Sequence, residues 1–151
     1  MNWEFKGKEV TNIKQFPEGA VGFIYILTFS DGKRYIGRKN LYTIRKKPLG
    51  KKALAQIKDK RLKKYEIIKK ESDWNKYYSS NKIIKDKMKS GDLEIESREI
   101  IKVCFTEKQM TYFETQTLFC YGVLEYPEQY YNDNILGRFY KKDLINEESD
   151  N

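Results

Sequence analysis

Short apolar runs and polar turns alternate along the first forty residues and again near residue 100. Residues 21–29 (VGFIYILTF) are almost wholly apolar and rich in β-branched and aromatic types, which predicts a buried strand. Residues 30–32 (SDG) mark a turn, and residues 33–38 are expected to return as a second strand. Residues 93–104 alternate and then become apolar, which predicts a third strand.

The middle of the chain is expected to form a helix that follows an irregular loop. Residues 39–50 contain Pro48 and Gly50, which disfavour regular structure. In residues 51–70 the apolar side chains recur roughly on one side, which predicts an amphipathic helix. Residues 71–80 (ESDWNKYYSS) are expected to form a loop that is packed by its aromatic side chains.

Two further helices carry capping signals. Ser80 is expected to cap a helix that runs through Ser90. Thr106 and Gln109 form a capping box, which predicts a helix over residues 106–121. Together these elements predict an α/β (α+β) fold, in which a small three-stranded, mostly antiparallel sheet is flanked by helices.

The length of 151 residues fits one domain. Residues 1–20 are expected to be an N-terminal extension of that domain, and residues 142–151 a loose acidic tail. The chain has no apolar run of roughly 18 residues and no apolar signal core, so no membrane segment and a cytoplasmic location are expected. The oligomeric state is left open.

Positive charge is concentrated in one quarter of the chain. The formal net charge is +8, but residues 33–70 alone carry +14 and the remainder carries −6. Such a block predicts nucleic-acid binding through neutralisation of phosphates, although a solvated lysine-rich helix is the alternative. The side chains expected to contact DNA are Lys39, Lys46, Lys47, Lys51, Lys52, Lys58, Arg61 and Lys64.

Tyr25 and Tyr35 occupy the two strands on either side of the predicted turn. A two-residue loop would place them on opposite faces, because side chains alternate along a strand. A three-residue loop with a left-handed Gly32 makes them diagonal neighbours on one face. We favour this register, which places Gly37 across from Tyr25 and leaves open space above it. Half-buried packing is the alternative role for both tyrosines.

One carboxylate falls inside the apolar side of the helix predicted over residues 106–121. Glu114 follows Met110 by four residues and precedes Leu118 by four. A carboxylate in that position needs a cation, hydrogen bonds or a metal ion to compensate its desolvation, unless it lies at the edge and pairs with a surface lysine. The chain contains no histidine, which excludes an imidazole ligand or base.

These residues resemble the GIY-YIG nuclease family. The family is named after two strand motifs about ten residues apart, which correspond here to residues 23–25 (FIY) and 35–37 (YIG). Phe23 stands where the family usually has glycine, although Gly22 precedes it. The resemblance extends over residues 20–140, nearly the whole chain.

The resemblance implies further site residues and a cofactor. The family's arginine, some ten residues after the second tyrosine, corresponds to Arg45, while the nearby Arg38 leaves that assignment open. Its metal-binding glutamate corresponds to Glu114, and its later asparagine corresponds to Asn132. Many members carry histidine or tyrosine four residues after the arginine. This chain has Leu49 there, and Tyr42, Tyr77 or Tyr78 could substitute for it.

The activity that the resemblance implies is cleavage of DNA with Mg²⁺ (or Mn²⁺) held by Glu114. Tyr25 would accept the proton of the attacking water, and Tyr35 would orient the water or donate to the phosphate. A phage-type homing or mobile endonuclease is the leading interpretation, and a restriction-type endonuclease is the second. The alternatives outside the enzymes are a nucleic-acid-binding module with a degenerate site and a basic structural protein.

Overall fold

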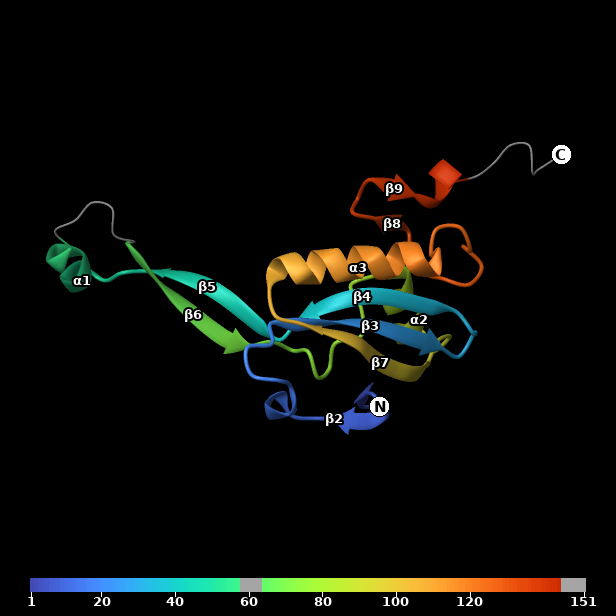
Figure 1. Ribbon diagram of the computed structural model, residues 1–151, viewed down its shortest axis with the longest axis horizontal. Coiled ribbons are helices and arrows are strands. Elements are labelled where there is room, and N and C mark those ends of the chain that lie inside the picture. The colour runs from blue at the N-terminus through green and yellow to red at the C-terminus, as the bar shows by residue number, and fades with distance from the viewer. Residues whose placement is uncertain (58–63, 145–151) are drawn as a thin grey trace.

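A mixed five-stranded sheet forms the centre of the molecule in the computed structural model, which describes residues 1–57 and 64–144 (Figure 1). The strand order is β2-β1-β7-β3-β4, and all neighbours are antiparallel except β1 and β7. The strands are β1 (Trp3–Phe5), β2 (Lys8–Val10), β3 (Gly22–Phe29), β4 (Arg34–Asn40) and β7 (Ile95–Cys104). The predicted fold class is confirmed, but the sheet has five strands rather than three.

The two additional strands come from residues 1–20, which are expected from the sequence to be an extension. β1 lies beside β7, and a 3-10 turn, η1 (Ile13–Gln15), follows β2. Trp3 is fully buried, packs edge-on against Phe23 and donates its indole N–H to the Trp74 carbonyl at 2.8 Å. Strands of three residues show too little alternation to be recognised, and β7, which joins β1 to the sheet, lies far along the chain.

The β3–β4 hairpin has the register that the sequence predicts. Tyr25 lies opposite Gly37. The Phe29 amide donates to the Lys33 carbonyl at 2.9 Å, which closes a three-residue loop. Gly32 has a φ of 83°, a left-handed conformation that glycine adopts without a steric penalty. The loop length therefore places both tyrosines on one face of the sheet.

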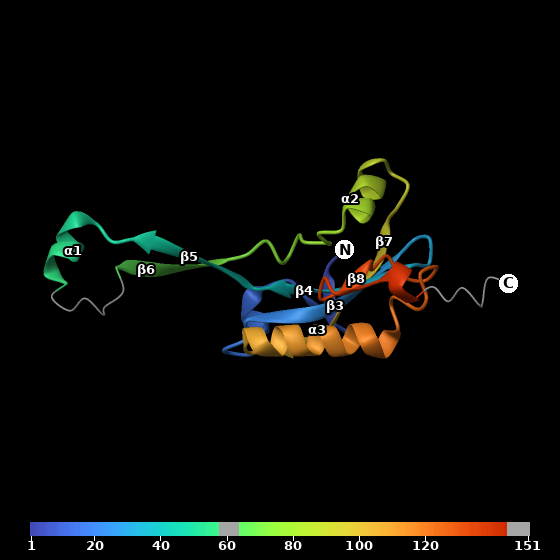
Figure 2. The same ribbon diagram turned by 90° about the horizontal axis from the view of Figure 1, so that it is seen from above.

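Helices cover the two faces of the sheet (Figure 2). α3 (Glu107–Tyr121) lies against one face, capped by Thr106 and ended by Gly122 as the sequence predicts. α2 (Lys82–Lys89) lies on the other side. Asn81 caps α2 by accepting from the Ile84 amide at 3.1 Å, so the predicted cap at Ser80 is wrong by one residue.

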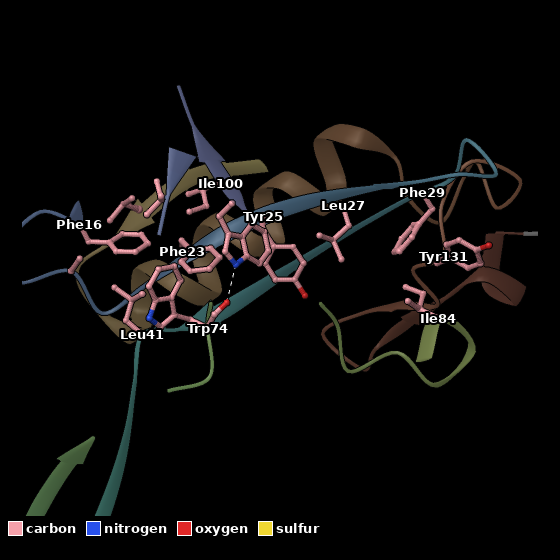
Figure 3. Close-up of a cluster of buried hydrophobic side chains, with 14 of the residues drawn as sticks. Phe16, Phe23, Tyr25, Leu27, Phe29, Leu41, Trp74, Ile84, Ile100 and Tyr131 are labelled. Atoms are coloured by element: carbon pink, nitrogen blue, oxygen red, sulfur yellow. Dashed lines mark hydrogen bonds between the residues drawn. The ribbon is translucent and has the colours of Figure 1, made fainter. Parts of the chain in front are cut away.

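Two apolar clusters hold these layers together. Buried residues of β3 and β4 pack against Met110 and Leu118 of α3 on one side. On the opposite side, alternate residues of β3 face the N-terminal strands, the loop at Trp74 and α2 (Figure 3). Figure 3 shows the row along β3 that forms this second cluster: Phe23, Tyr25, Leu27 and Phe29.

A two-stranded arm extends away from the central sheet (Figure 1). It consists of β5 (Tyr42–Pro48) and β6 (Tyr65–Glu71), which form a separate two-stranded sheet, and of α1 (Lys51–Gln56). The predicted loop at 39–50 and the predicted helix over 65–70 are therefore wrong, α1 keeps only the start of that helix, and residues 58–63 lie outside the described residues. Tyr and Ile, which favour strands, recur in both β5 and β6, while Pro48 is the last residue of β5 and does not interrupt it.

The C-terminal segment adds a small hairpin over one end of α3 (Figure 1). It consists of β8 (Asn134–Ile135), β9 (Phe139–Tyr140) and a 3-10 turn, η2 (Lys141–Leu144). The start of the predicted acidic tail is thus part of η2, and its remainder lies outside the described residues. None of the helices in the described part of the chain is long and apolar enough to cross a membrane.

Candidate active site

A pocket of about 510 Å³ opens between β4, α3 and the two segments that flank α2 and β8. It is lined by side chains that the sequence places up to a hundred residues apart. The lining residues are Tyr35, Ile36, Arg38, Ser80, Asn81, Thr111, Glu114, Leu118, Asn132, Asp133, Asn134 and Leu136. Four of the predicted site residues, Tyr35, Arg38, Glu114 and Asn132, therefore meet in one cavity.

Glu114 and Arg38 face each other across the pocket. The Arg38 Nε lies 3.9 Å from the Glu114 Oε1, and its Nη1 donates to the Thr111 hydroxyl at 2.8 Å. The Glu114 side chain keeps only 23% of its exposure. Burial raises the pKa of Glu114, and the guanidinium of Arg38 opposes that rise. The pocket thus contains an incompletely compensated carboxylate beside a fixed cation.

The donor set fits a hydrated divalent ion. Glu114 offers a hard oxygen ligand that is partly desolvated, and Asp133 lines the same pocket. In residues 1–57 and 64–144, no three His, Cys, Asp or Glu side chains gather at one point. An ion held at Glu114 would therefore take most of its ligands from water and substrate, which suits Mg²⁺ because it dehydrates reluctantly.

The two tyrosines of the hairpin lie side by side, but only Tyr35 lines the pocket. Tyr25 is 1% exposed, and its ring centroid lies 6.3 Å from that of Tyr35. The Tyr25 phenol lies over Gly37, where an added Cβ would come within 2.5 Å of the hydroxyl oxygen. The space expected above Gly37 is thus filled by Tyr25 itself, and the YIG motif needs glycine because the ring passes so close.

The loop before α2 closes over the same tyrosines. The Tyr77 ring centroid is 6.1 Å from that of Tyr25, and the two side chains are hydrogen-bonded. Burial, and then the neighbouring Tyr35 and Tyr77, raise the pKa of Tyr25 well above its ordinary value. Burial also raises the pKa of Tyr35, although hydrogen bonds from Ser79 and Ser80 lower it. Both phenols are therefore protonated at neutral pH, and Tyr77 is the loop tyrosine that contacts the predicted base.

A buried arginine that the sequence does not single out holds this loop in place. Arg98 of β7 donates from Nη1 to the carbonyls of Met1 at 2.7 Å and Asn75 at 3.1 Å, and from Nη2 to the carbonyl of Tyr77. Its guanidinium stacks 4.2 Å above the Trp3 ring. One side chain therefore ties the N-terminus, β7 and the loop together.

Arg98 is also electrostatically coupled to Tyr25. Burial lowers the pKa of Arg98 to about 10, while an ionised Tyr25 would raise it. Because such coupling is reciprocal, Arg98 favours the phenolate form of Tyr25. In the run ESREI, an arginine between polar residues has the pattern of a solvent-exposed strand position. Only the packing of residues 1–5 and 72–80 over that face reveals its burial.

Asn132 supports the pocket from its wall. Its Nδ2 donates to the Ile36 carbonyl at 2.8 Å, and its Oδ1 accepts from the Ile36 amide at 3.0 Å. The buried side chain thus pairs with the free edge of β4 in the way that another strand would. It positions the residues on either side of Ile36, which are Tyr35 and Gly37.

Arg45 does not lie in the pocket. It sits on β5, opposite Ile68, in the arm that points away from the central sheet (Figure 1). Lys39 is engaged locally, with its ammonium 2.5 Å from Asp73 and 4.1 Å above the Tyr77 ring. The remaining predicted DNA contacts that the structure describes, Lys46, Lys47, Lys51, Lys52 and Lys64, are exposed on the arm, whereas Lys58 and Arg61 lie outside the described residues.

Comparison with models of protein families gives a match. A family model described as "Putative endonuclease segE, GIY-YIG domain" matches residues 3–135. No curated protein and no solved structure matches the chain. The matched range begins in β1 and ends in β8, so it includes the whole central sheet, the arm and every residue that lines the pocket except Leu136.

Proposed function

The chain belongs to the GIY-YIG nuclease family, and we propose that it is a divalent-metal-dependent endonuclease that hydrolyses phosphodiester bonds in DNA. The observation that carries this proposal is the meeting of Tyr35, Arg38 and Glu114 in one pocket, with Tyr25 packed directly behind Tyr35. The combination offers a hydroxyl pair, a fixed cation and a carboxylate, which are the groups that phosphate hydrolysis needs.

Each of these groups has a distinct task in the proposed reaction. Arg38 binds the non-bridging oxygens of the phosphate, and its bond to Thr111 holds the guanidinium in place. Glu114 would hold the ion, which when bound stabilises charge on the phosphate and on the leaving oxygen. Tyr35 orients the attacking water, because it is the one of the two tyrosines that lines the pocket.

In this scheme Tyr25, which lies behind Tyr35 and does not line the pocket, accepts the proton of that water by way of one bridging water. Its raised pKa makes it a poor base unless positive charge lies nearby. Arg98 offers that charge from the side of the core, and an ion held by Glu114 would add to it from the side of the pocket. The +14 segment of the sequence does not, because most of it lies on the arm.

We assign the arginine of the reaction to Arg38 rather than to Arg45. Arg38 lines the pocket and lies 3.9 Å from Glu114, whereas Arg45 stands on the arm. A phage-type homing or mobile endonuclease that acts in the host cytoplasm is the biological role that we propose for such an enzyme.

The proposal is tested by incubating the purified protein with supercoiled plasmid and with phage DNA in the presence of Mg²⁺, Mn²⁺ or excess EDTA. We expect nicked or linear products with either metal and none with EDTA. Protein with the substitution Glu114→Gln, prepared in parallel, controls for a contaminating nuclease. Tight DNA binding without any cleavage under all metal conditions would contradict the proposal and support a non-catalytic binding module instead.

A further inference from the structure

The β5–β6 arm is a two-stranded ribbon without a core of its own. Its strands pair only with each other over seven residues each. Ile44 is 66% exposed and Ile67 is 56% exposed, although both are large apolar residues. An isolated two-stranded hairpin is marginally stable in water, so a ribbon that leaves both faces open is suited to packing against a partner.

The register divides the arm into two faces, because side chains alternate along each strand. We define the aromatic face by Tyr42, Ile44, Lys46, Pro48, Tyr65, Ile67, Lys69 and Glu71. We define the basic face by Thr43, Arg45, Lys47, Glu66, Ile68 and Lys70.

The cations of the aromatic face are used within the arm. Lys46 lies 4.6 Å above the Tyr65 ring, and Lys69 lies 4.0 Å above the Tyr42 ring. Each contact joins β5 to β6 between diagonal neighbours, and such pairs stabilise a hairpin. The lysines of this face therefore hold the ribbon together.

The cations of the basic face are left for a partner. Arg45, Lys47 and Lys70 make no ion pair with any carboxylate in the described residues, although Glu66 lies opposite Lys47 in the register. All three are exposed. The face carries three cations against one carboxylate over the length of a single hairpin.

We propose that the arm enters the major groove of B-form DNA with its basic face toward the nucleic acid. A two-stranded ribbon has the width that the major groove, about 12 Å across, admits. Seven residues at ~3.3 Å each span about 23 Å, roughly two-thirds of a helical turn. The side chain of Arg45, in the middle of β5, is then a phosphate or base contact rather than part of the hydrolytic pocket.

This inference rests on the proposed function in one respect, namely that the substrate is duplex DNA. It adds a second, non-catalytic contact that starts within two residues of the pocket strand, since β4 ends at Asn40 and β5 begins at Tyr42. The ribbon would thereby fix the position of the duplex relative to Arg38 and Glu114, because phosphate and groove contacts set register and orientation.

Binding in EDTA separates this inference from the catalytic one. We compare the full-length protein with a triple variant, Arg45→Gln, Lys47→Gln and Lys70→Gln, on a 30-base-pair DNA duplex at several salt concentrations. The matched control removes three exposed cations that lie off the arm, on the β1–β2 hairpin and at the end of α2: Lys6→Gln, Lys8→Gln and Lys89→Gln. Circular dichroism and thermal melts verify that all three proteins are folded.

We expect the arm variant to bind at least about tenfold more weakly and to flatten the slope of log K against log salt by about 2–3, since each phosphate contact contributes ~0.9. The control variant should keep the wild-type slope to within about one unit. Equal slopes for arm variant and wild type would overturn the inference while leaving the proposed cleavage activity intact. A wild-type protein that neither binds nor cleaves DNA would overturn both.

An RNA duplex of the same length tests groove entry rather than charge alone. The major groove of A-form RNA is deep and narrow, so a ribbon cannot enter it. We expect the wild type to prefer DNA over RNA, and the arm variant to lose most of that preference. If duplex RNA binds the wild-type protein as tightly as duplex DNA does, the arm contributes only positive surface charge, and its insertion into the groove is overturned.

Discussion

The pocket strand β4 and the β5–β6 arm follow each other in the sequence, but the pocket is stabilised by buried contacts and the arm by the pairing of two exposed strands. Tyr25, Gly37 and Asn132 are buried among fixed partners, and the hydroxyl, amide and carboxylate groups there have neighbours within a few ångströms. The arm keeps its large aliphatic side chains and its cations in water. The pocket is therefore organised before a ligand binds, whereas the described part of the arm is held mainly by the pairing of β5 with β6.

The difference indicates how the two regions divide the work of the proposed enzyme. In and behind the pocket, desolvation raises the pKa values of Tyr25, Tyr35 and Glu114. It also strengthens the electrostatic interaction of these groups with a nearby cation. The exposed cations of the arm would supply affinity in the proposed complex, because surface cations release counterions when they meet phosphates. Substitutions in the two regions should therefore affect different measured quantities.

Glu114→Gln is expected to show the largest difference between its effect on the cleavage rate and its effect on DNA binding. The amide keeps the shape of the side chain but loses the charge that would hold the ion, so cleavage should fall by roughly a thousandfold or more while DNA binding changes little. Single-turnover cleavage and binding in EDTA measure the two quantities. Glu128→Gln, which changes an exposed loop carboxylate, should leave both unchanged. Metal-dependent cleavage above a few per cent of wild type in Glu114→Gln would contradict this assignment.

Tyr25→Phe is expected to slow cleavage at least about a hundredfold, as is typical for loss of a general base. The ring and its packing against Tyr35 and Tyr77 remain, so the free energy of unfolding should fall by only about 1 kcal/mol, the worth of the hydroxyl's hydrogen bond. Tyr35→Phe should give a smaller defect of the same kind. A reversed order of the two defects would assign the proton acceptor to Tyr35.

The pH dependence of the same variants sharpens this test. The pKa of Tyr25 lies above its ordinary value, so the phenolate fraction should increase tenfold per pH unit across the neutral and mildly alkaline range. Wild-type cleavage should rise accordingly with pH, and Tyr25→Phe should lose that rise. A slope that survives in Tyr25→Phe would show that another group releases or accepts the proton.

Paired substitutions of the two arginines compare the regions directly. Arg38→Gln removes a cation that lies 3.9 Å from Glu114, so it should lower the single-turnover rate by several tens-fold with little change in binding. Arg45→Gln should leave the rate at saturating protein unchanged and weaken binding by a few-fold. A larger loss of single-turnover rate in Arg45→Gln than in Arg38→Gln would place the reaction's arginine on the arm.

Arg98 acts through its neighbours, so its substitution is expected to affect the rate less than substitution of Glu114, Tyr25 or Arg38. Arg98→Met leaves the carbonyls of Met1, Asn75 and Tyr77 without their donor, which should lower the free energy of unfolding by about 3 kcal/mol. It also removes the buried cation that favours ionised Tyr25, so its pH–rate profile should shift to higher pH and cleavage at neutral pH should fall about tenfold.

Arg98→Lys controls for the charge. It keeps a cation near Tyr25 but cannot make the three carbonyl contacts, so it should be destabilised while its pH–rate profile stays close to wild type. Thermal melts and rates between pH 6 and pH 10 test both variants. Destabilisation of Arg98→Met without any shift of its profile would restrict Arg98 to a structural role.

Local features were sufficient for the hairpin that carries the tyrosines. Loop length and the alternation of side chains determine which face each residue occupies, so the turn at residues 30–32 predicts Tyr25 opposite Gly37 from nearby residues alone. The helix over residues 106–121 was predictable for the same reason. Its caps are local, and Glu114 stands out because the helical period places it among apolar residues.

The arm could not be predicted in this way. A strand or helix pattern arises because one face is buried, and the strands of the arm leave both faces largely exposed, so the apolar residues of 65–70 matched a helical period by coincidence. The actual structure depends on β5 pairing with β6 across the intervening residues. That pairing removes Arg45 from the pocket, although its spacing from Tyr35 resembles that of the family.

The sequence by itself determined the family, the paired tyrosines and the glutamate within the apolar side of α3, because each depends on spacing along a single element or hairpin. Only the tertiary structure decided which arginine faces Glu114, that Tyr25 lies behind Tyr35, and that Arg98 is a buried cation beside them. These relations join β1, β4, β7, α3 and the loop before α2. Contacts between segments so distant in the chain depend on how the layers pack, which no local period records.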